Sequence, residues 1–211
     1  MSVAEDRSTT TTVISPIADP APLGLAAFAL TTFLLSADNA HWMTAASGAA
    51  WLSYAFFYGG LVQLLAGMWE FRNRNVFGAT AFGTYGGFWL GLAFWARFAF
   101  THPLAGLVGI HDLGWILLAF AIFNTYMLLW STQLNWAIFG VFLTLEATEI
   151  ILFIGFFTLS AGATTNITIK IGGYVGVLTA IVAWYTSAAG VTNGMGGRLK
   201  LPVGRPLVGQ R

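Results

Sequence analysis

Long stretches without a charged residue recur along this chain, and they restrict its fold more than any other feature. A helix needs about 20 predominantly apolar residues to cross the ~30 Å hydrocarbon core of a bilayer. We count six such stretches, at about residues 22–40, 45–69, 76–96, 113–131, 136–158 and 169–193. The alternation of apolar and polar residues that marks a transmembrane β-barrel is absent from the sequence. The chain is therefore predicted to be an all-α integral membrane protein, a bundle of six transmembrane helices.

The composition and the ends of the chain fit one membrane domain. Hydrophobic residues make up 57% of the sequence and charged residues 8%, whereas soluble domains contain roughly 25% charged residues. Residues 1–18 lack the basic and apolar regions of a signal peptide, and we expect a disordered cytoplasmic tail there. Residues 19–197 are the predicted six-helix transmembrane domain, and residues 198–211 are a predicted basic cytoplasmic tail. The net charge of +1 does not indicate nucleic-acid binding.

The basic residues predict how the helices are oriented in the membrane. Seven of the nine lysines and arginines lie in the terminal segments or in loops on the same side as the termini, namely Arg7, Arg72, Arg74, Arg198, Lys200, Arg205 and Arg211. The opposite side has Arg97 and Lys170. Because cytoplasmic loops carry an excess of Lys and Arg, both termini are predicted to be cytoplasmic. The protein is then a multi-pass protein of the plasma or inner membrane.

Two of the predicted spans carry glycines at helical spacing. These are Gly83, Gly87 and Gly91 in the third span, and Gly172, Gly173 and Gly176 in the sixth. Small residues let helix backbones approach closely in membrane lipid, where no hydrophobic force drives helices together. The pattern therefore predicts a compact bundle or a tight oligomer.

Two carboxylates lie deep in the fifth predicted span. Glu146 and Glu149 are roughly 10 and 13 residues into it, which is close to mid-membrane at 1.5 Å per residue. Their spacing places them on one face of the helix, where two neighbouring carboxyl groups are not expected to ionise together. Carboxylates at this depth are costly and mark ion or proton pathways. Two interpretations stay open: a protonatable pair used in transport, or a structural pair bonded to hydroxyls and amides of neighbouring helices.

The second predicted span carries two further polar groups, Gln63 and Glu70, which are seven residues apart and share a face. Glu70 lies at the cytoplasmic end beside Arg72 and Arg74, where it forms either an interfacial ion pair or part of a cytoplasmic mouth. Gln63 lies deeper in the span. Its amide either bonds another helix or lines a pore.

The remaining reactive residue types do not predict a chemical site. The histidines, His41, His102 and His111, all lie on the predicted outer side and lack the helical spacing of a metal site. The absence of cysteine excludes disulfides and thiolate metal ligands. No nucleophile with a base and an orienting group is visible in the sequence. The chain is therefore expected not to be an enzyme, and no metal or cofactor is expected.

Two stretches resemble a known family. DPAPLGLAAFALTTFLLSADNA, which begins at Asp19, resembles the NPAPLGL signature of the acetate uptake transporter family, the succinate-acetate permeases. Residues 57–89, FYGGLVQLLAGMWEFRNRNVFGATAFGTYGGFW, resemble the second block of that family. The resemblance is colinear over residues 20–202. Asp19 stands where the family usually has Asn, a mild departure because both side chains can cap a helix.

The resemblance implies an acetate transporter with six helices per subunit, assembled as a hexamer in which each subunit has its own solute path. The apolar constriction of the family would fall on Phe28, Tyr85 and Leu145. The amide and the small residue of the family's substrate path would be Gln63 and Ala183. The two carboxylates of the fifth span are not implied by the resemblance, because that part of the helix varies in the family.

These features predict a transporter of acetate and, by resemblance, of succinate and other small monocarboxylates. A path for a small anion needs hydrogen-bond donors around a narrow apolar middle, and the candidates are Gln63, Asn39, Thr31, Thr32 and Thr84. Few fixed cations lie in the spans, which favours movement of the solute with a proton and coupling through the two carboxylates of the fifth span. The alternatives are a passive channel for acetate or formate, ammonium conduction, and an acetate sensor that does not transport.

Overall fold

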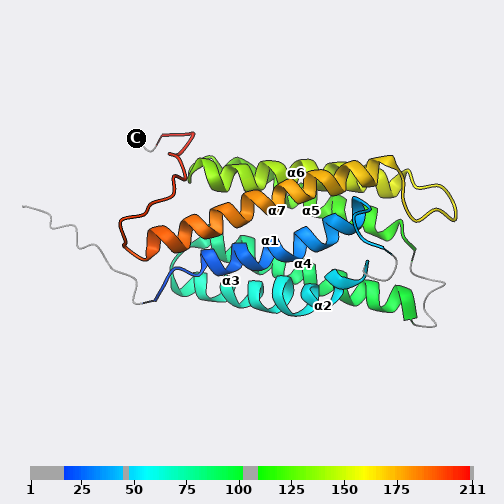
Figure 1. The fold of residues 1–211 in the computed structure, drawn as a ribbon, viewed down its shortest axis with the longest axis horizontal. Helices are drawn as coiled ribbons and strands as arrows, with labels where there is room; N and C mark the ends of the chain where they lie inside the picture. The colour runs from blue at the N-terminus through cyan, green and yellow to red at the C-terminus, as the bar shows by residue number, and fades with distance from the viewer. Residues whose placement is uncertain (1–16, 45–47, 102–108, 210–211) are drawn as a thin grey trace, which may run out of the picture.

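The computed structural model of the protein describes residues 17–44, 48–101 and 109–209, and every regular element within these ranges is a helix (Figure 1). The elements are α1 (Ala21–Asn39), α2 (Ala50–Phe56), the π-helix η1 (Phe57–Val62), α3 (Gln63–Arg72), α4 (Val76–Thr101), α5 (Asp112–Ser131), α6 (Trp136–Phe157) and α7 (Ile167–Gly194). The predicted all-α class is confirmed for this part of the chain.

The helix ends agree closely with the predicted spans. α1, α5, α6 and α7 begin and end within two residues of the predictions, and each is long and apolar enough to cross a membrane. α2, η1 and α3 follow one another without a break from Ala50 to Arg72, so this segment starts and ends later than the second predicted span at 45–69. α4 continues past the third predicted span to Thr101. His102 and most of the predicted N-terminal tail lie outside the described residues.

Asparagine side chains begin the last two helices. Asn135 Oδ1 accepts a hydrogen bond from the N–H of Ile138 at 2.9 Å, and Asn166 Oδ1 accepts one from the N–H of Ile169 at 2.9 Å. Both asparagines have extended backbones, so each side chain satisfies an N–H group that has no partner within its helix. These caps set where α6 and α7 start and therefore how deep their side chains lie.

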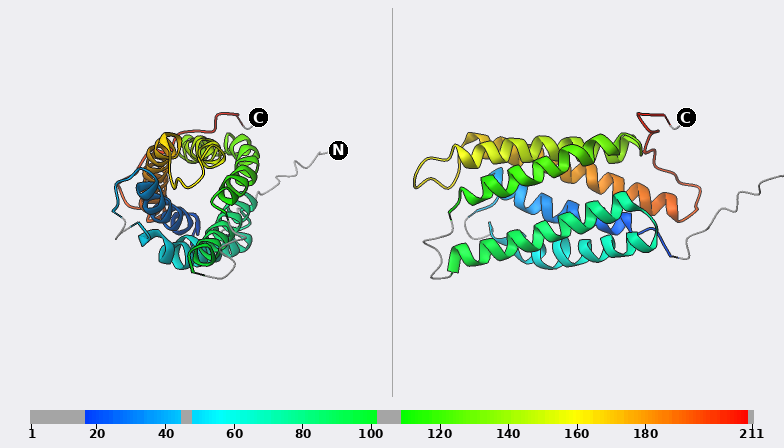
Figure 2. Two further views of the ribbon diagram at one scale, coloured as in Figure 1. Left: turned by 90° about the vertical axis from the view of Figure 1, so that its right-hand side faces the viewer. Right: turned by 180° about the vertical axis from the view of Figure 1, so that it is seen from behind.

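The helices form a ring around the long axis of the bundle (Figure 2, left). α7 packs against α1 and α6, α5 packs against α6, and α3 packs against α4. The first described residues and the segment after α7 lie at one end of the bundle, which we call the terminal end (Figure 1). We call the opposite end, which carries the connection between α6 and α7, the distal end.

Glycines of α7 allow its close contacts, as the sequence predicts. A Cβ atom on Gly176 would collide with Ser36 of α1, and one on Gly172 would lie 2.5 Å from the side chain of Leu152 in α6. Small residues are therefore required where α7 lies between its two neighbours.

The glycine stripe of α4 is used differently at its two ends. A Cβ atom on Gly67 of α3 would lie 2.5 Å from the backbone N of Gly83, so α3 and α4 approach each other closely at this point. Gly87 and Gly91 face away from the bundle, and no described atom of another element lies within 4 Å of a Cβ atom built there. Within the subunit, the stripe thus serves helix packing at Gly83.

The segment after α7 returns across the terminal end. Asn193 donates from Nδ2 to the carbonyl of Leu201 at 2.9 Å and accepts from the N–H of Leu201 at 3.0 Å. Further on, the carbonyl of Val203 accepts from the N–H of Ala137 at the start of α6, at 3.0 Å. The described part of the basic C-terminal segment therefore lies against the bundle.

Replacing Asn193 with alanine should release this segment. The change removes two hydrogen bonds of about 1 kcal/mol each, which raises the population of the released segment about thirtyfold. Limited trypsin digestion measures the effect as faster cleavage after Lys200, with Thr192→Ala as the neighbouring control. Equal cleavage rates in the two variants would contradict an anchoring role for Asn193.

Candidate functional site

The three predicted constriction residues lie together in the structure. Phe28, Tyr85, Leu145 and Ala183 belong to one buried cluster, and none of the four is more than 6% exposed. The rings of Phe28 and Tyr85 meet edge to face, with centroids 5.7 Å apart and planes at 64°. The four residues come from α1, α4, α6 and α7, so side chains from four helices meet at this point of the ring.

The start of α1 sets the depth of Phe28. Asp19 Oδ1 accepts from the N–H of Ala21, the first residue of the helix, at 3.0 Å. Pro22 follows in the first turn, where its missing N–H leaves no bond unmade. Ser187 of α7 donates to the carbonyl of Pro22 at 2.6 Å. Phe28 therefore lies about two turns above a helix start that is anchored to α7.

A cavity of about 460 Å³ opens at the terminal end, and we call it the terminal cavity. Phe28, Tyr85 and Leu145 lie at its inner end, and Gln63 lies in its wall. Val203 of the C-terminal segment also lines it. The polar residues nearest the helix ends are mostly uncharged amides, namely Asn73, Asn75, Asn135 and Asn193, together with Asp19.

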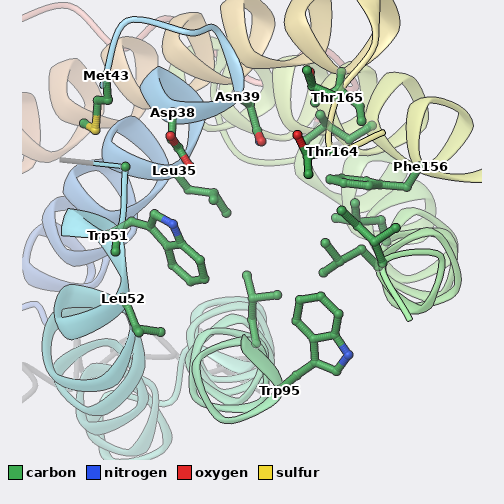
Figure 3. Close-up of a pocket in the computed structure, with 18 of the residues that line it drawn as sticks. Leu35, Asp38, Asn39, Met43, Trp51, Leu52, Trp95, Phe156, Thr164 and Thr165 are labelled. Carbon is green, nitrogen blue, oxygen red and sulfur yellow. The ribbon is translucent and has the colours of Figure 1, made fainter. Parts of the chain in front are cut away.

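A second cavity, of about 550 Å³, lies at the distal end, and we call it the distal cavity. Figure 3 shows its wall, with polar side chains on the sides formed by α1 and the α6–α7 loop and indole rings from α2 and α4; the labelled residues include Asp38, Asn39, Thr164, Trp51 and Trp95. His41 Nε2 lies 2.9 Å from the hydroxyl oxygen of Thr165. This hydrogen bond joins the end of α1 to the α6–α7 loop at the rim.

One apolar layer separates the two cavities. Along α4, Tyr85 lines the terminal cavity and Phe88 lines the distal cavity. Along α6, Leu145 lines the terminal cavity and Leu152 lines the distal cavity. The ring centroid of Phe88 lies 4.6 Å from that of Phe120 and 6.3 Å from that of Tyr85. The layer is therefore one to two helical turns thick, roughly 5–10 Å.

The predicted polar residues of the path do not all face a cavity. Gln63 lines the terminal cavity. Thr31 is buried, and its hydroxyl donates to the carbonyl of Ala27 at 3.0 Å. Thr32 is buried and Thr84 is half-buried, and among the described residues that line the two cavities none of the three threonines is found. Of the predicted polar residues, Gln63 thus lies in the wall of the terminal cavity and Asn39 in that of the distal cavity, whereas the three threonines line neither.

Gln63 owes its direction to the π-helix, which the sequence analysis did not predict. A π-helical turn holds one more residue than an α-helical turn, so η1 rotates α3 and its first residue, Gln63, relative to α2. Gly59 lets η1 pack against α1, because a Cβ atom there would lie 2.6 Å from the hydroxyl oxygen of Thr31. Short π-helical stretches often occur at functional sites.

The two carboxylates of α6 join a buried network that includes Asn124 of α5, a residue that the sequence analysis missed. Asn124 is fully buried, and its Nδ2 donates to Glu146 Oε2 at 2.7 Å. The Tyr85 hydroxyl lies 3.1 Å from Asn124 Oδ1 and 3.1 Å from Glu149 Oε1. These contacts are the hydrogen bonds expected if the two carboxylates form a structural pair bonded to hydroxyls and amides of neighbouring helices. They also connect both carboxylates to Tyr85, one of the predicted constriction residues.

Glu70 is fully buried beside the mouth of the terminal cavity. Asn73 Nδ2 donates to Glu70 Oε2 at 3.1 Å, so the carboxylate bonds an amide rather than Arg72 or Arg74, and the ion pair considered from the sequence is not formed. A Cβ atom on Gly78 would lie 2.6 Å from Glu70 Oε1. Asn73 and Gly78 both line the terminal cavity, which places Glu70 directly behind its wall.

Known proteins have sequences similar to this one. The profile of the GPR1/FUN34/yaaH family matches residues 6–204. Acetate permease A of Emericella nidulans is 40% identical over 195 residues, which cover 88% of this chain and 65% of that protein, so the chain spans less than two thirds of that relative. The succinate-acetate/proton symporter SatP of Escherichia coli is 32% identical over 197 residues, which cover 89% of this chain and 96% of that protein.

The architecture is shared as well. The solved structure of the bacterial acetate channel SatP matches with a TM-score of 0.78 at 32% identity, covering 89% of this chain and 99% of that chain. Agreement over this length means that the ring of helices, and not one part of it, is common to the two proteins. The chain is a multi-pass membrane protein, and it belongs to the GPR1/FUN34/yaaH family.

Proposed function

We propose that this protein transports acetate and related small monocarboxylates across the cell membrane. The observation that supports the proposal most is the pair of cavities at opposite ends of the bundle, separated by one apolar layer that includes Phe28, Tyr85 and Leu145. The relatives are named as an acetate permease, a succinate-acetate/proton symporter and an acetate channel. Since these are transport proteins, we infer that the chain moves a solute and does not catalyse its conversion.

The shape and chemistry of the path match a small monocarboxylate. An apolar constriction rejects strongly hydrated and bulky ions, and acetate has one methyl group to place against it. In the terminal cavity the Gln63 amide can donate a hydrogen bond to the carboxylate. Succinate has a second carboxylate, which must lose its bound water before the molecule can pass the same layer. We therefore expect succinate to be transported more slowly than acetate.

We propose that six helical segments cross the membrane and that both termini are cytoplasmic, so that the terminal cavity faces the cytoplasm. Residues 50–72 and α4 are each longer than the ~20 residues that a span requires. The excess of basic residues on the terminal side supports this orientation. Residues 1–18 and 198–211, which precede and follow the transport domain at 19–197 in the sequence, then both lie in the cytoplasm. The exposed Gly87 and Gly91 support assembly into a homo-oligomer, for which we propose a hexamer.

Within this path, each predicted site residue has a proposed role. Phe28, Tyr85 and Leu145 form the constriction, with Ala183 beside them. Glu70 shapes the cytoplasmic mouth from behind its wall. The three threonines are proposed as further hydrogen-bond donors to the solute, although they line neither cavity; these residues are Thr31, Thr32 and Thr84.

For the driving force, we propose that a proton moves with acetate and that Glu146 and Glu149 are the coupling groups. Their hydrogen bonds to the constriction through Tyr85 and Asn124 support this role. A passive, channel-like path is the second candidate. The channel-like path is favoured because both cavities are present in the same conformation. A solute would then need to cross only the thin layer between them.

Uptake of labelled acetate by proteoliposomes tests the proposal. With an inward proton gradient of one pH unit and matched membrane potential, one proton per acetate supports about tenfold accumulation. We expect the purified protein to reach that level faster than protein-free vesicles, in which acetic acid leaks across the bilayer. We also expect the initial uptake rate to rise with the size of the gradient.

The alternatives give different results in the same vesicles. Saturable equilibration that does not respond to the proton gradient would identify a passive path. Acetate binding without uptake above the protein-free leak would identify a sensor and overturn the transport proposal. Labelled methylammonium in parallel vesicles tests ammonium conduction, and we expect no uptake of it above the leak.

A further inference from the structure

The side-chain amide of Asn124 has a fixed orientation in the buried network at the proposed constriction. Its Nδ2 donates to the carbonyl of Phe142 at 3.0 Å and to Glu146 Oε2 at 2.7 Å. These two bonds use both N–H groups of the amide. Asn124 Oδ1, which can only accept, therefore faces the hydroxyl of Tyr85.

The Tyr85 hydroxyl has one proton for two neighbours at the same distance, 3.1 Å from Asn124 Oδ1 and 3.1 Å from Glu149 Oε1. When Tyr85 donates to Asn124, its contact with Glu149 is a hydrogen bond only if Glu149 is a carboxylic acid and donates. When Glu149 is ionised, Tyr85 donates to it, and Asn124 Oδ1 loses its donor. Both contacts are therefore satisfied in the protonated state of Glu149.

Glu146 has the surroundings of an ionised carboxylate. It is half-buried, and it accepts from Asn124 Nδ2 at 2.7 Å and from the hydroxyl of Thr125 at 2.7 Å. The Thr125 hydroxyl also lies 2.9 Å from the carbonyl oxygen of Ala121, so its one proton is shared between that carbonyl and Glu146. The bond from Asn124 is not shared in this way. Short bonds of this kind are strongest when the acceptor is charged.

Glu149 has the opposite surroundings. It is 3% exposed, and no described residue donates a hydrogen bond to its Oε2. The titratable groups that face it are Tyr85 of α4 and Glu146 of its own helix, and neither carries positive charge. The polar group that α5 places nearby, the Asn124 amide, is uncharged. An ionised carboxylate without a positive partner is strongly unfavourable at this depth.

We propose that Glu149 carries a proton while the constriction is closed, that Glu146 is ionised, and that the proton on Glu149 keeps the Tyr85 hydroxyl on Asn124. Asn124 is then a positioning residue. Loss of the proton turns the hydroxyl of Tyr85 from Asn124 towards Glu149. Because Tyr85 lines the terminal cavity, this turn conveys the protonation state of Glu149 to the solute path. That consequence for transport rests on the proposed function, whereas the assignment of the proton does not.

Infrared spectroscopy of the protein in lipid tests the assignment directly. At neutral pH we expect the carbonyl stretching band of a buried carboxylic acid, lost in Glu149→Gln and kept in the matched control Glu146→Gln. Tyr85→Phe removes the hydrogen-bond partner of Glu149 and leaves both partners of Glu146 in place, so we expect it to shift the band towards the frequency of a free acid. Absence of the band from the wild type, or its loss in Glu146→Gln instead, would overturn the assignment. If the Glu149→Gln protein does not fold, an unshifted band in Tyr85→Phe would overturn it equally.

Uptake by the same proteins separates this inference from the proposed function. We expect Glu149→Gln to lose the stimulation of acetate uptake by a proton gradient, so that the ratio of rates with and without the gradient falls to that of protein-free vesicles. If the wild type shows the Glu149 band but no acetate uptake, the proposed function fails and the assignment stands. If the wild type takes up acetate but the band is absent, the assignment fails and the proposed function stands.

Discussion

Valine in place of Gly67 is expected to lower the melting temperature of the detergent-solubilised protein by about 6–12 °C. A Cβ atom there would lie 2.5 Å from the backbone N of Gly83, and a backbone cannot move aside as the end of a side chain can. α3 and α4 must therefore separate along their contact. Overpacking of a close interface costs about 3 kcal/mol at the upper end of its usual range, which for a chain of this length corresponds to that shift.

Gly87→Val is the matched control, since it makes the same change on α4 where no described atom of another element lies within 4 Å of the new Cβ. We expect this variant to keep the melting temperature of the wild-type subunit. Its mass in detergent also tests whether the outward half of the stripe is an oligomer contact. Equal melting temperatures for Gly67→Val and Gly87→Val would show that the contact of α3 with α4 is not close in the membrane protein.

Alanine in place of Leu145 should relax the size selectivity of transport. Leu145 is buried against Phe28 and Tyr85 at the inner end of the terminal cavity, and truncation to alanine removes three of its carbon atoms. A single methylene group changes discrimination at an apolar site by about 1–3 kcal/mol. We therefore expect the ratio of butyrate uptake to acetate uptake to rise by about tenfold or more. Competition between the two labelled acids in proteoliposomes measures this ratio.

Leu143→Ala provides the comparison for the selectivity experiment, because Leu143 is on the same helix but is 47% exposed and away from the constriction. We expect it to leave the butyrate-to-acetate ratio unchanged. Truncating a buried leucine also costs about 2–5 kcal/mol of stability, so the melting temperature of each variant is measured alongside uptake. A folded Leu145→Ala protein with the wild-type ratio would rule out Leu145 as a determinant of size.

The spans could be read from the sequence because their causes are local. A bilayer requires each crossing segment to be apolar over a set length, whatever its neighbours do. The ends of α1, α5, α6 and α7 accordingly lie within two residues of the predictions. The hydrogen bond from the N–H of Ala21 to Asp19 was also predictable, since it needs only the first turn of the helix that follows Asp19.

Other features of the site had weak signals or none. Phe88 follows Tyr85 by three residues and so lies on the same face of α4, a spacing that could have identified it as part of the apolar layer. Asn124 had the same weak signal as Gln63, an amide within an apolar span, but the sequence does not show which partner such an amide bonds. The π-helix was not predictable either, because it depends on the packing of Gly59 against Thr31 of α1.

The sequence by itself determined that this protein is a bundle of membrane helices, and its motifs pointed to the residues of the proposed constriction. Which polar groups reach that constriction was decided by the tertiary structure. Tyr85 bonds partners 39 and 64 positions away, Asn124 and Glu149, and no local pattern encodes such distances. Gln63 faces a cavity and the three threonines do not, and this difference depends on how the helices rotate and pack. Hydrophobic length acts on each helix separately, whereas a hydrogen-bond network exists only where side chains from several helices meet.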